Sequence, residues 1–553
     1  MFMTDHIGAH CLMRTWVALG LRHVVISPGS RNAPLVIAAN QFPDLKLFTA
    51  LDERAAAHMA LGMALANGIP AAVISTSGTA SLNHGPALAE AYYQGVPLMS
   101  VTADRPVHTR NQGLGQSVQQ EGMFDAHVLW SGQIDEQSMS TEAMEKLATT
   151  AWTKALSGPV HMNMPFEEPL YGTTEAVADS AKPIVTPHQL EQDAMPDSLE
   201  SLLSQHDVRI VVHIGALAIH SISESMVEQL IDRCAVIADV FGSNQQAAES
   251  SSMRLLCGWN EEVIASWRPH AIITVGLPPM DKKLRAVMTS WNAPHWHVGL
   301  EANAWDMFSS LQGNWRISPE MGLQELIDSL PGFNGFAQRW EVQRARSFQF
   351  QLEASNEDWV DFNVFQWLST HLVDHCNRLH FANSTAARYA QWFHWEGMIL
   401  HANRGVAGID GCLSTAVGDA LKNPEEEVVL ISGDAAWLYD QNGFQVRPQP
   451  KNLKVIVINN GGGNIFRWLE GPEKSGLLER FFESGFGQSM RGSAEQLGMQ
   501  YSICKDWISL ESAFSLWSTE KGPSLLEIAT PGPASASHLK SMLDRMEHLL
   551  NPS

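Results

Sequence analysis

The chain is long and strongly acidic. It has 553 residues, of which 45% are hydrophobic and 17% charged, and its formal net charge at pH 7 is -23. Because one hydrophobic core stops growing at about 250–300 residues, this length predicts two or three globular domains, and the composition excludes a disordered chain. The negative charge argues against nucleic acid and anionic membrane surfaces as partners.

Cysteine usage and hydropathy indicate the compartment. The chain has no C-x-x-C pair, which argues against zinc and dithiol redox chemistry, and residues 1–23 lack the continuous apolar run of a secretory signal. No stretch approaches the ~20 apolar residues of a membrane span. We therefore expect a soluble, cytoplasmic protein without stable membrane insertion. Its cysteines should be free thiols; they are Cys11, Cys234, Cys257, Cys376, Cys412 and Cys504.

Short β-branched runs, each followed by a turn of small or polar residues and then a helical stretch, recur along the chain. Near the N-terminus they are 23–27, 71–75 and 97–102. Apolar runs without alternation are typical of strands buried on both faces, and strands that alternate with helices predict parallel sheets. Such sheets bind ligands beyond the carboxyl ends of their strands, so we expect functional residues there.

The same pattern returns in two later blocks. Its further strands are predicted at 208–214, 235–240, 270–276, 295–299, 379–383, 398–403, 428–432, 453–459 and 524–528. Stretches near 172–200 and 331–360 interrupt the pattern and are interpreted as linkers. The sequence therefore predicts an α/β fold of three doubly wound domains with mainly parallel sheets, at residues 1–182, 190–345 and 358–553.

An acid and an amide follow two of the later strands. Gly433-Asp434 ends one predicted strand, and Asn459-Asn460 ends the next, ahead of the glycines 461–463. Mg²⁺ prefers hard oxygen ligands, often shared with phosphates, and glycines let the backbone approach a diphosphate closely. Gly-Asp and Asn-Gly are also common turn dipeptides, which is the alternative for either piece alone. Together, at this spacing, they predict a metal–diphosphate site.

This spacing resembles the thiamine-diphosphate enzyme superfamily, which often has Gly at the position of Ala435. The resemblance implies thiamine diphosphate as the cofactor, with Mg²⁺ or alternatively Mn²⁺. It implies Asp434, Asn460 and the Gly462 carbonyl as metal ligands. The implied cofactor contacts are Ser77, Gly78, Thr79, Ile409, Gly433, Asp434, Ala435, Ala436, Asn460, Gly462, Asn464 and Ile465.

Enzymes of this superfamily use a Glu that hydrogen-bonds the aminopyrimidine ring and relays the proton of the reactive carbon. The run 47–51 followed by Asp52-Glu53-Arg54 has the form of a short strand opening a helix of small residues. The alternative is that Asp52 and Glu53 only complement the dipole of that helix. Because the Asp434 motif accompanies it, we predict Glu53 as the catalytic acid–base residue.

A longer series of motifs narrows the resemblance. In order, these are Ser27-Pro28-Gly29-Ser30-Arg31-Asn32, Leu51-Asp52-Glu53-Arg54, Ser75-Thr76-Ser77-Gly78-Thr79-Ala80, Thr102-Ala103-Asp104-Arg105-Pro106, Asn383-Ser384 with Arg388, Asn403-Arg404-Gly405-Val406-Ala407-Gly408-Ile409-Asp410-Gly411 and Asn464-Ile465-Phe466. This series resembles the 2-succinyl-5-enolpyruvyl-6-hydroxy-3-cyclohexene-1-carboxylate synthase family of menaquinone biosynthesis, most weakly at 185–350. The resemblance implies decarboxylation of 2-oxoglutarate and 1,4-addition of the four-carbon acyl anion to isochorismate.

Both implied substrates are dicarboxylates, which the planar fork of arginine binds well. The matching positions are Arg31, Arg105, Arg388 and Arg404, with Ser30, Ser384, Gln116 and Lys282 as further substrate donors, although Lys283 is adjacent to Lys282. Ile409 matches the residue under the bent cofactor, and Ile465, Phe466 and Leu469 match an apolar wall near the reactive carbon. Gly115 stands where the family usually has Asn. Each Arg alone also fits a surface salt bridge, and Leu469 equally fits core packing.

Two alternative functions remain at this point. One is another thiamine-dependent 2-oxo-acid decarboxylase or carboligase, similar to acetolactate synthase, although four arginines are more than a small monocarboxylate needs. The other is a non-catalytic scaffold that kept the fold, which intact Glu53, Asp434 and Asn460 argue against. The family resemblance also implies a homodimer or homotetramer, with Glu53 and Asp434 of one site coming from different subunits.

Overall fold

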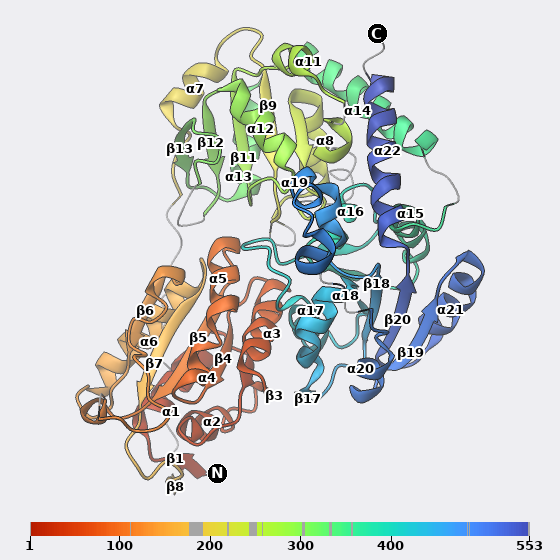
Figure 1. The fold of residues 1–553 in the computed structure, drawn as a ribbon. Helices are drawn as coiled ribbons and strands as arrows, with labels where there is room; N and C mark the ends of the chain where they lie inside the picture. Colours follow the sequence, from red (N-terminus) through yellow and green to blue (C-terminus); the bar gives the residue numbers. More distant parts are fainter. Residues whose placement is uncertain are drawn as a thin grey trace. The chain divides into compact units, whose positions relative to one another are not determined.

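The computed structural model describes residues 2–110, 112–175, 192–217, 221–242, 251–256, 258–300, 305–330, 334–354, 358–483, 485 and 487–550. The predicted domain limits at 182 and 190 lie outside these residues. The chain forms two compact units. The first consists of Met1–Gln189, Asn403–Glu425 and Tyr439–Leu453, and the second of Leu190–Ala402, Glu426–Leu438 and Lys454–Ser553. Three mainly parallel sheets covered by helices confirm the predicted α/β class (Figure 1).

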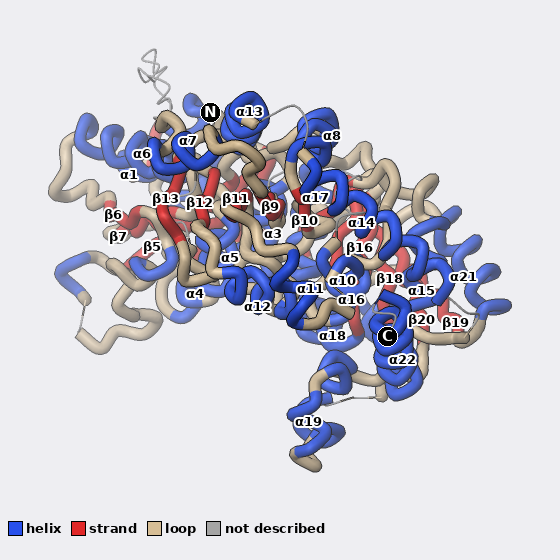
Figure 2. Tube along the Cα trace, turned by 90° about the horizontal axis from the view of Figure 1, so that it is seen from above, coloured by secondary structure: helices blue, strands red, loops and turns tan. Residues whose placement is uncertain are grey.

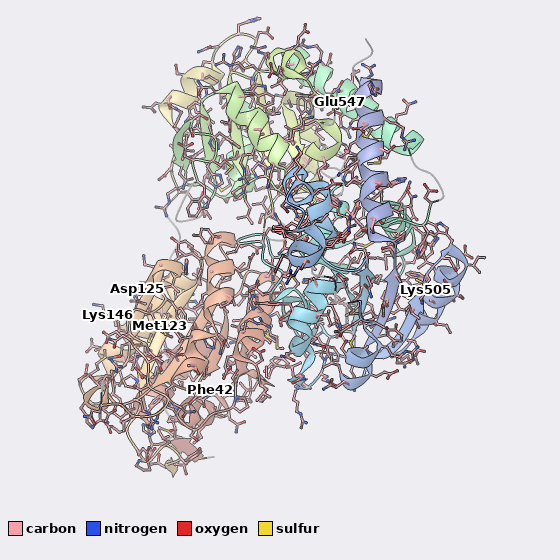
Figure 3. All side chains as sticks on the ribbon, viewed as in Figure 1. Phe42, Met123, Asp125, Lys146, Lys505 and Glu547 are labelled. Carbon is pink, nitrogen blue, oxygen red and sulfur yellow. The ribbon has the colours of Figure 1, made fainter. Side chains whose placement is uncertain are left out.

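The first unit is built on a seven-stranded sheet. Its order is β17 (Val446–Arg447), β3 (Lys46–Ala50), β2 (His23–Ile26), β4 (Ala71–Ser75), β5 (Leu98–Asp104), β7 (Val160–Pro165) and β6 (Trp130–Gln133). All pairs are parallel except β17 with β3. Helices α1 (Ile7–Leu19), α2 (Ala33–Ala39) and α6 (Thr141–Ala155) share one core with this sheet. Phe42, labelled in Figure 3, packs against that core.

Helix α3 (Glu53–Leu65) is buried along its length and packs on α17 (Cys412–Lys422). Glycines make this approach possible. A Cβ atom at Gly62 would lie 2.0 Å from the Thr415 carbonyl oxygen, and one at Gly418 would lie 2.0 Å from the Met59 carbonyl oxygen. The two helices therefore touch backbone to backbone, which ties the segment around α17 to the N-terminal sheet.

The second unit contains a five-stranded parallel sheet with cores on both faces. Its order is β10 (Ala235–Ala238), β9 (Ile210–Ile214), β11 (Ala271–Val275), β12 (His295–Val298) and β13 (Leu311–Trp315). Helix α14 (Gly335–Ala354) packs Phe336 and Trp340 into one core, and Trp340 Nε1 donates to the Val236 carbonyl oxygen at 3.0 Å. Much of the stretch interpreted as a linker near 331–360 is thus a packed helix.

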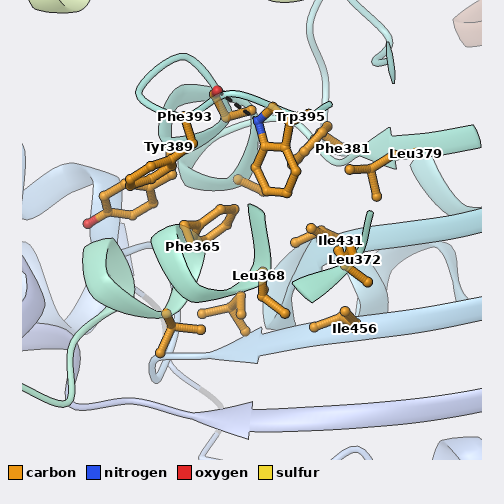
Figure 4. Packing of buried hydrophobic residues seen from close by; sticks show 14 of the residues in the cluster. Phe365, Leu368, Leu372, Leu379, Phe381, Tyr389, Phe393, Trp395, Ile431 and Ile456 are labelled. Atoms are coloured by element: carbon orange, nitrogen blue, oxygen red, sulfur yellow. Dashed lines mark hydrogen bonds between the residues drawn. The ribbon is translucent and has the colours of Figure 1, made fainter. Parts of the chain in front are cut away.

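The second unit also contains a six-stranded sheet. Its order is β15 (Ile399–His401), β14 (Arg378–Phe381), β16 (Val428–Gly433), β18 (Leu453–Asn459), β20 (Ser524–Ala529) and β19 (Gln500–Cys504). Helices α15 (Asp361–His371) and α16 (Thr385–Ala390) cover one face. Figure 4 shows Phe365 and Leu368 of α15 packed with Tyr389 of α16 and with Ile431 and Ile456 of the sheet. This core fixes the two helices that carry Asp361 and Arg388.

Two expectations from composition can be compared with the described part of the chain. Cys11, Cys234, Cys376, Cys412 and Cys504 are buried free thiols there, as expected, and Cys257 lies outside it. No described helix is long and apolar enough to cross a membrane.

Candidate functional site

The loops after β2, β4 and β5 meet at one edge of the first sheet. A Cβ atom at Gly29 would lie 2.4 Å from Thr76 Cβ, and one at Gly78 would lie 2.9 Å from Gln116 Cα, so both turns need glycine. Gly78 also has φ +84°, which favours glycine. Ser77 and Gly78 are buried, whereas Ser30, Thr79 and Gln116 are exposed. The structure thus brings three loops that carry predicted site residues together at the carboxyl ends of adjacent strands.

Arg31 and Arg105 lie near each other at this edge. Arg31 is buried; its Nη1 donates to the Phe166 carbonyl oxygen at 3.1 Å, and its Nη2 pairs with Glu168 Oε1 at 3.2 Å. Burial, and then the charge of Arg105, lower the pKa of the Arg31 guanidinium. Arg105 Nη2 donates to the Gly115 carbonyl oxygen at 2.8 Å. Two cations thus lie at one sheet edge, with the Glu168 carboxylate beside Arg31.

Asp52 and Glu53 occupy different positions at the start of α3. Asp52 is the N-cap: its Oδ1 accepts from the backbone N–H groups of Arg54 at 2.9 Å and Ala55 at 3.2 Å. Glu53 is the first helical residue and is half-buried. Among the described residues its carboxylate has no hydrogen bond or ion pair. Asp52 therefore caps the helix, while Glu53 stands in the first turn, where its charge also complements the helix dipole.

The predicted Asn-Arg-Gly loop is held from two sides within the first unit. Glu90 of α5 (Gly85–Gln94) is buried, and its carboxylate accepts from the backbone N–H groups of Gly405 at 2.5 Å and Val406 at 2.8 Å. At the other end of the loop Gly411 lies against the His58 ring, because a Cβ atom there would be 1.9 Å from His58 Cδ2. The half-buried Arg404 and Ile409 sit in this clamped loop.

In the second unit, Asp434 and Asn460 follow the neighbouring strands β16 and β18. Asp434 is buried, and its Oδ1 accepts from the Ala435 backbone N–H at 2.7 Å. Burial is the main reason that the pKa of Asp434 rises to about 6; backbone N–H groups of Gly461 and Gly462 work against this rise. Asn460 Nδ2 donates to Asp361 Oδ2 at 2.8 Å. The predicted metal ligands therefore share one sheet edge.

Ser384 and Arg388 are joined at the end of β14, in the same sheet. Ser384 precedes α16 with φ 75° and ψ -124°, a conformation that non-glycine residues rarely adopt. Arg388 Nη1 donates to the Ser384 carbonyl oxygen at 2.9 Å. Strain of this kind concentrates at functional sites, because the surrounding structure must hold the residue there.

The apolar wall predicted after Asn460 occupies a segment that projects from its unit. The 3₁₀ helix η4 (Asn464–Trp468) leads to α19 (Glu470–Lys474), which stands away from the sheet in Figure 2. Ile465 and Phe466 are half-buried, with the Phe466 ring 5.7 Å from that of Phe482, and Leu469 is 39% exposed. Exposure of Leu469 argues against simple core packing at that position.

Lys282 and its neighbour Lys283 open helix α12 (Lys282–Trp291), and both are exposed. No hydrogen bond or ion pair between described residues joins Lys282 to another predicted site residue.

The residues present fit a diphosphate cofactor with a divalent metal. Asp434 and Asn460 are oxygen ligands of the kind Mg²⁺ prefers, and Asn464 Oδ1 is a buried acceptor without a hydrogen-bond partner among the described residues. Gly462 has φ +128°, and a Cβ atom there would lie 2.4 Å from the Glu483 carbonyl oxygen. Only glycine therefore allows the backbone to take this path beside Asn460.

Two family models and relatives of nearly the same length match this chain. Residues 7–127 match the thiamine pyrophosphate enzyme N-terminal TPP binding domain, and residues 382–528 match the corresponding C-terminal TPP binding domain. A 2-succinyl-5-enolpyruvyl-6-hydroxy-3-cyclohexene-1-carboxylate synthase of Flavobacterium psychrophilum is 31% identical over 527 residues, covering 93% of this chain and 94% of the relative. The synthase of that name from Flavobacterium johnsoniae is 32% identical over 534 residues, covering 95% and 96%.

The chain belongs to the 2-succinyl-5-enolpyruvyl-6-hydroxy-3-cyclohexene-1-carboxylate synthase family. The family resemblance expected from the motifs is thereby confirmed, and with it a thiamine-dependent enzyme class.

Three residues of this synthase-family chain support the site but carried no motif. Gln120 Oε1 accepts from the Gly78 N–H, and its Nε2 donates to the Ala103 carbonyl oxygen, each at 3.0 Å, so a buried amide holds the Gly78 turn. Glu90 holds the Arg404 loop, and Asp361 holds Asn460. Glu90 and Asp361 look in sequence like ordinary helix acids. Only their lack of exposure distinguishes them, and that is not visible in the sequence.

Proposed function

We propose that this chain decarboxylates 2-oxoglutarate and adds the resulting succinyl semialdehyde anion to isochorismate in a 1,4-addition, as a step of menaquinone biosynthesis. The product would be 2-succinyl-5-enolpyruvyl-6-hydroxy-3-cyclohexene-1-carboxylate, the compound in the name of the relatives. The observation that carries the proposal is the pair Asp434 and Asn460 at neighbouring strand ends of one sheet. This pair is supported by the strained Ser384 and the adjoining Arg388 at the next strand end.

Asp434, Asn460 and the Gly462 carbonyl would hold Mg²⁺, or Mn²⁺ in its place, against the cofactor diphosphate. Bound thiamine diphosphate supplies the electron sink that lets a 2-oxo acid lose CO₂. Gly433, Ala435, Ala436, Asn464 and Ile465 would line the diphosphate side, and Ser77, Gly78, Thr79 and Ile409 the ring side. Glu53 would hold a proton on its carboxyl group and exchange it with the aminopyrimidine ring. Its carboxylate, free of other partners within the described chain, supports that role.

The cationic residues would bind the substrate carboxylates. Arg31 and Arg105 lie at one strand edge, and Arg388 is joined to Ser384 at another. Arg404, Ser30, Gln116 and Lys282 would add further donors. Phe466 and Leu469, with Ile465, would exclude water and disfavour the charged carboxylate, which promotes its loss as CO₂.

We also propose a domain division, a compartment and an oligomeric state for this chain. The domains would comprise a pyrimidine-binding domain at 1–182, a central domain at 190–345 and a diphosphate- and metal-binding domain at 358–553. The protein would work in the cytoplasm as a homodimer or homotetramer, in which Glu53 of one subunit serves the metal site of another. Light scattering of the purified protein checks the assembly, and a monomer would remove the shared site.

A paired-substrate assay tests the reaction. We expect 2-oxoglutarate and isochorismate to be consumed together, and only when thiamine diphosphate and Mg²⁺ are both present. Pyruvate in place of 2-oxoglutarate should give no product. Turnover with pyruvate would reject the dicarboxylate assignment in favour of an acetolactate-synthase-like carboligase, and no turnover with any 2-oxo acid would favour a scaffold.

A further inference from the structure

Asp361 is a buried acid whose two carboxylate oxygens are both used away from its own helix. It is the first residue of α15 and has 0% exposure. Its Oδ2 accepts from Asn460 Nδ2 at 2.8 Å, and its Oδ1 accepts from Thr530 Oγ1 at 2.5 Å. Asn464 Nδ2 lies 3.5 Å from the same Oδ2. A simple helix-starting acid would instead face the N–H groups of its own first turn.

The contact with Asn460 fixes which end of that amide is available. A side-chain amide has a donor NH₂ at one end and an acceptor oxygen at the other, and the two are exchanged by a flip. A carboxylate accepts hydrogen bonds, so Asp361 selects the Nδ2 end of Asn460. The Oδ1 end of Asn460 is then directed away from Asp361, and an amide oxygen is the atom that a hard cation takes as a ligand.

We propose that Asp361 is a positioning residue that locks the Asn460 amide in its metal-binding orientation. This inference rests on the proposed function, since it assigns Asn460 to the metal. Groups that hold a metal ligand from behind orient it, and losing one typically weakens metal binding by about 10- to 100-fold.

Asp361 is itself held firmly enough to act in this way. Its backbone N–H donates to Ser535 Oγ at 3.0 Å, and Thr530 anchors the carboxylate. Behind it, the apolar face of α15 is packed into the core of Figure 4 through Phe365 and Leu368. The Asp361 carboxylate therefore links the well-packed helix α15 to the end of strand β18.

Glu527 provides a matched control. It is also buried, and its Oε1 accepts from Asn459 Nδ2 at 2.7 Å, so it holds the amide one residue earlier. Asn459 is not a predicted metal ligand. A merely structural effect of removing a buried carboxylate should appear in both places, whereas a positioning effect on the metal should appear only at Asp361.

The test measures Mn²⁺ binding to the full-length protein with thiamine diphosphate, by electron paramagnetic resonance, without relying on turnover. Asp361→Asn places an NH₂ group where it can bond the Asn460 oxygen in competition with the metal. We expect it to weaken Mn²⁺ binding about 10- to 100-fold. Glu527→Gln should lower the unfolding temperature but leave the Mn²⁺ affinity within about twofold of wild type. Equal losses of affinity in both variants would overturn the positioning role.

Two further variants keep the test decisive if Asp361→Asn does not fold. Thr530→Val leaves the carboxylate but removes its second anchor, and should weaken Mn²⁺ binding by less. The double variant Asp361→Asn with Asn460→Asp restores a carboxylate–amide pair with the partners exchanged and should recover Mn²⁺ binding. Wild-type affinity in both Asp361→Asn and Thr530→Val would overturn the inference alone. Failure of the wild-type protein to bind Mn²⁺ would overturn the proposed function as well.

Discussion

Glu90 Oε1 accepts a hydrogen bond from the backbone N–H of Gly405 at 2.5 Å, across 315 residues of sequence. Glu90 Oε2 accepts from Val406 and Ala407 in the same way. One buried carboxylate thus satisfies three successive backbone donors. Arg404 immediately precedes them, so the shape of its loop depends on a helix of the N-terminal sheet.

Glu90→Gln should disturb that loop. The substitution replaces one accepting oxygen by NH₂, and a backbone N–H left without its charged acceptor loses about 1.5–3 kcal/mol. We expect a lower unfolding temperature and, if the arginine binds substrate, an increase of KM for one or both acids of about tenfold. Glu142→Gln removes the same charge from an exposed site on α6 and is the control. Unchanged KM with a lowered unfolding temperature would limit Glu90 to a structural role.

Glu53→Gln and Asp52→Asn should separate catalysis from capping. Glu53→Gln should abolish exchange of the cofactor C2 proton while thiamine diphosphate still binds, because only the proton relay is lost. Asp52→Asn affects the N-cap and should cost at most about 1 kcal/mol of stability, with exchange retained. Proton exchange by nuclear magnetic resonance and thermal unfolding distinguish the two. Wild-type exchange in Glu53→Gln would refute its catalytic role.

Asp434→Ala should abolish the Mg²⁺-dependent binding of thiamine diphosphate. In wild type, calorimetric titration should show tight binding of thiamine diphosphate only with Mg²⁺ present, and chelation of the metal should abolish it. Asp440→Asn alters another fully buried acid, which instead accepts from Ser414, and should lower stability without changing the metal dependence. Normal Mg²⁺-dependent binding in Asp434→Ala would place the metal elsewhere.

Arg388→Ala and Arg404→Ala should mainly raise KM. A charge-assisted hydrogen bond is worth about 1.5–3 kcal/mol, so we expect increases of roughly 10- to 100-fold. Arg388→Lys and Arg404→Lys keep the charge but lose the planar fork and should be intermediate. Arg491→Ala, at an exposed ion pair with Glu495, is the surface control. Steady-state kinetics with each acid varied in turn would also assign the arginines to substrates, and an unchanged KM would remove that arginine from the site.

Two buried histidines of the five-stranded sheet, His213 on β9 and His295 on β12, should make the free energy of unfolding depend on pH. Burial lowers the pKa of His213 to about 3 and of His295 to about 4, from an ordinary value of 6.5. Below pH 6.5 these histidines bind protons in the unfolded chain but stay neutral in the folded chain. The free energy of unfolding therefore falls as pH drops from 6.5 toward 4. Glu90 and Asp361, whose pKa values burial raises, act in the opposite sense.

Comparison of variants isolates the histidine contribution. His213→Leu should make the pH dependence of the unfolding temperature shallower between pH 6.5 and about 4, because one neutral buried imidazole is gone. His206→Leu changes an exposed histidine and should leave that slope as in wild type. Parallel slopes in all three proteins would show that His213 does not contribute.

Strands that are continuous apolar runs between turns could be predicted closely. The predicted runs 71–75 and 453–459 coincide with β4 and β18. Strand β7 was not predicted, because its buried His161 and Asn163 interrupt the apolar pattern. In the fold Thr102 Oγ1 hydrogen-bonds His161 Nε2 at 2.7 Å and donates to Asn163 Oδ1 at 2.9 Å. Buried polar pairs of this kind form only when two strands meet, so neither strand reveals them alone.

The candidate site likewise contains residues that a local sequence pattern reveals and residues that only the fold brings together. Glu53 and Asp434 follow local strand–turn patterns and can be found from them. Asp361 could not be found, because its partner Asn460 is 99 residues away and the intervening fold brings them together. Lys282 was predicted from the family match alone, and it lies exposed at the start of α12. Residues beside a local strand–turn pattern could therefore be predicted, whereas residues that support them through long-range hydrogen bonds could not.

The discontinuity of the first unit has a consequence for synthesis. Its sheet is completed by β17, and α3 is covered by α17, both from the segments Asn403–Glu425 and Tyr439–Leu453. On a ribosome that adds about 5–20 residues per second, domains generally fold as they emerge. Here the N-terminal sheet emerges with one edge and one buried helix uncovered, and both stay uncovered while residues 190–402 are synthesised. Its nascent form is thus a natural client for chaperones, and fragments ending before residue 403 should aggregate.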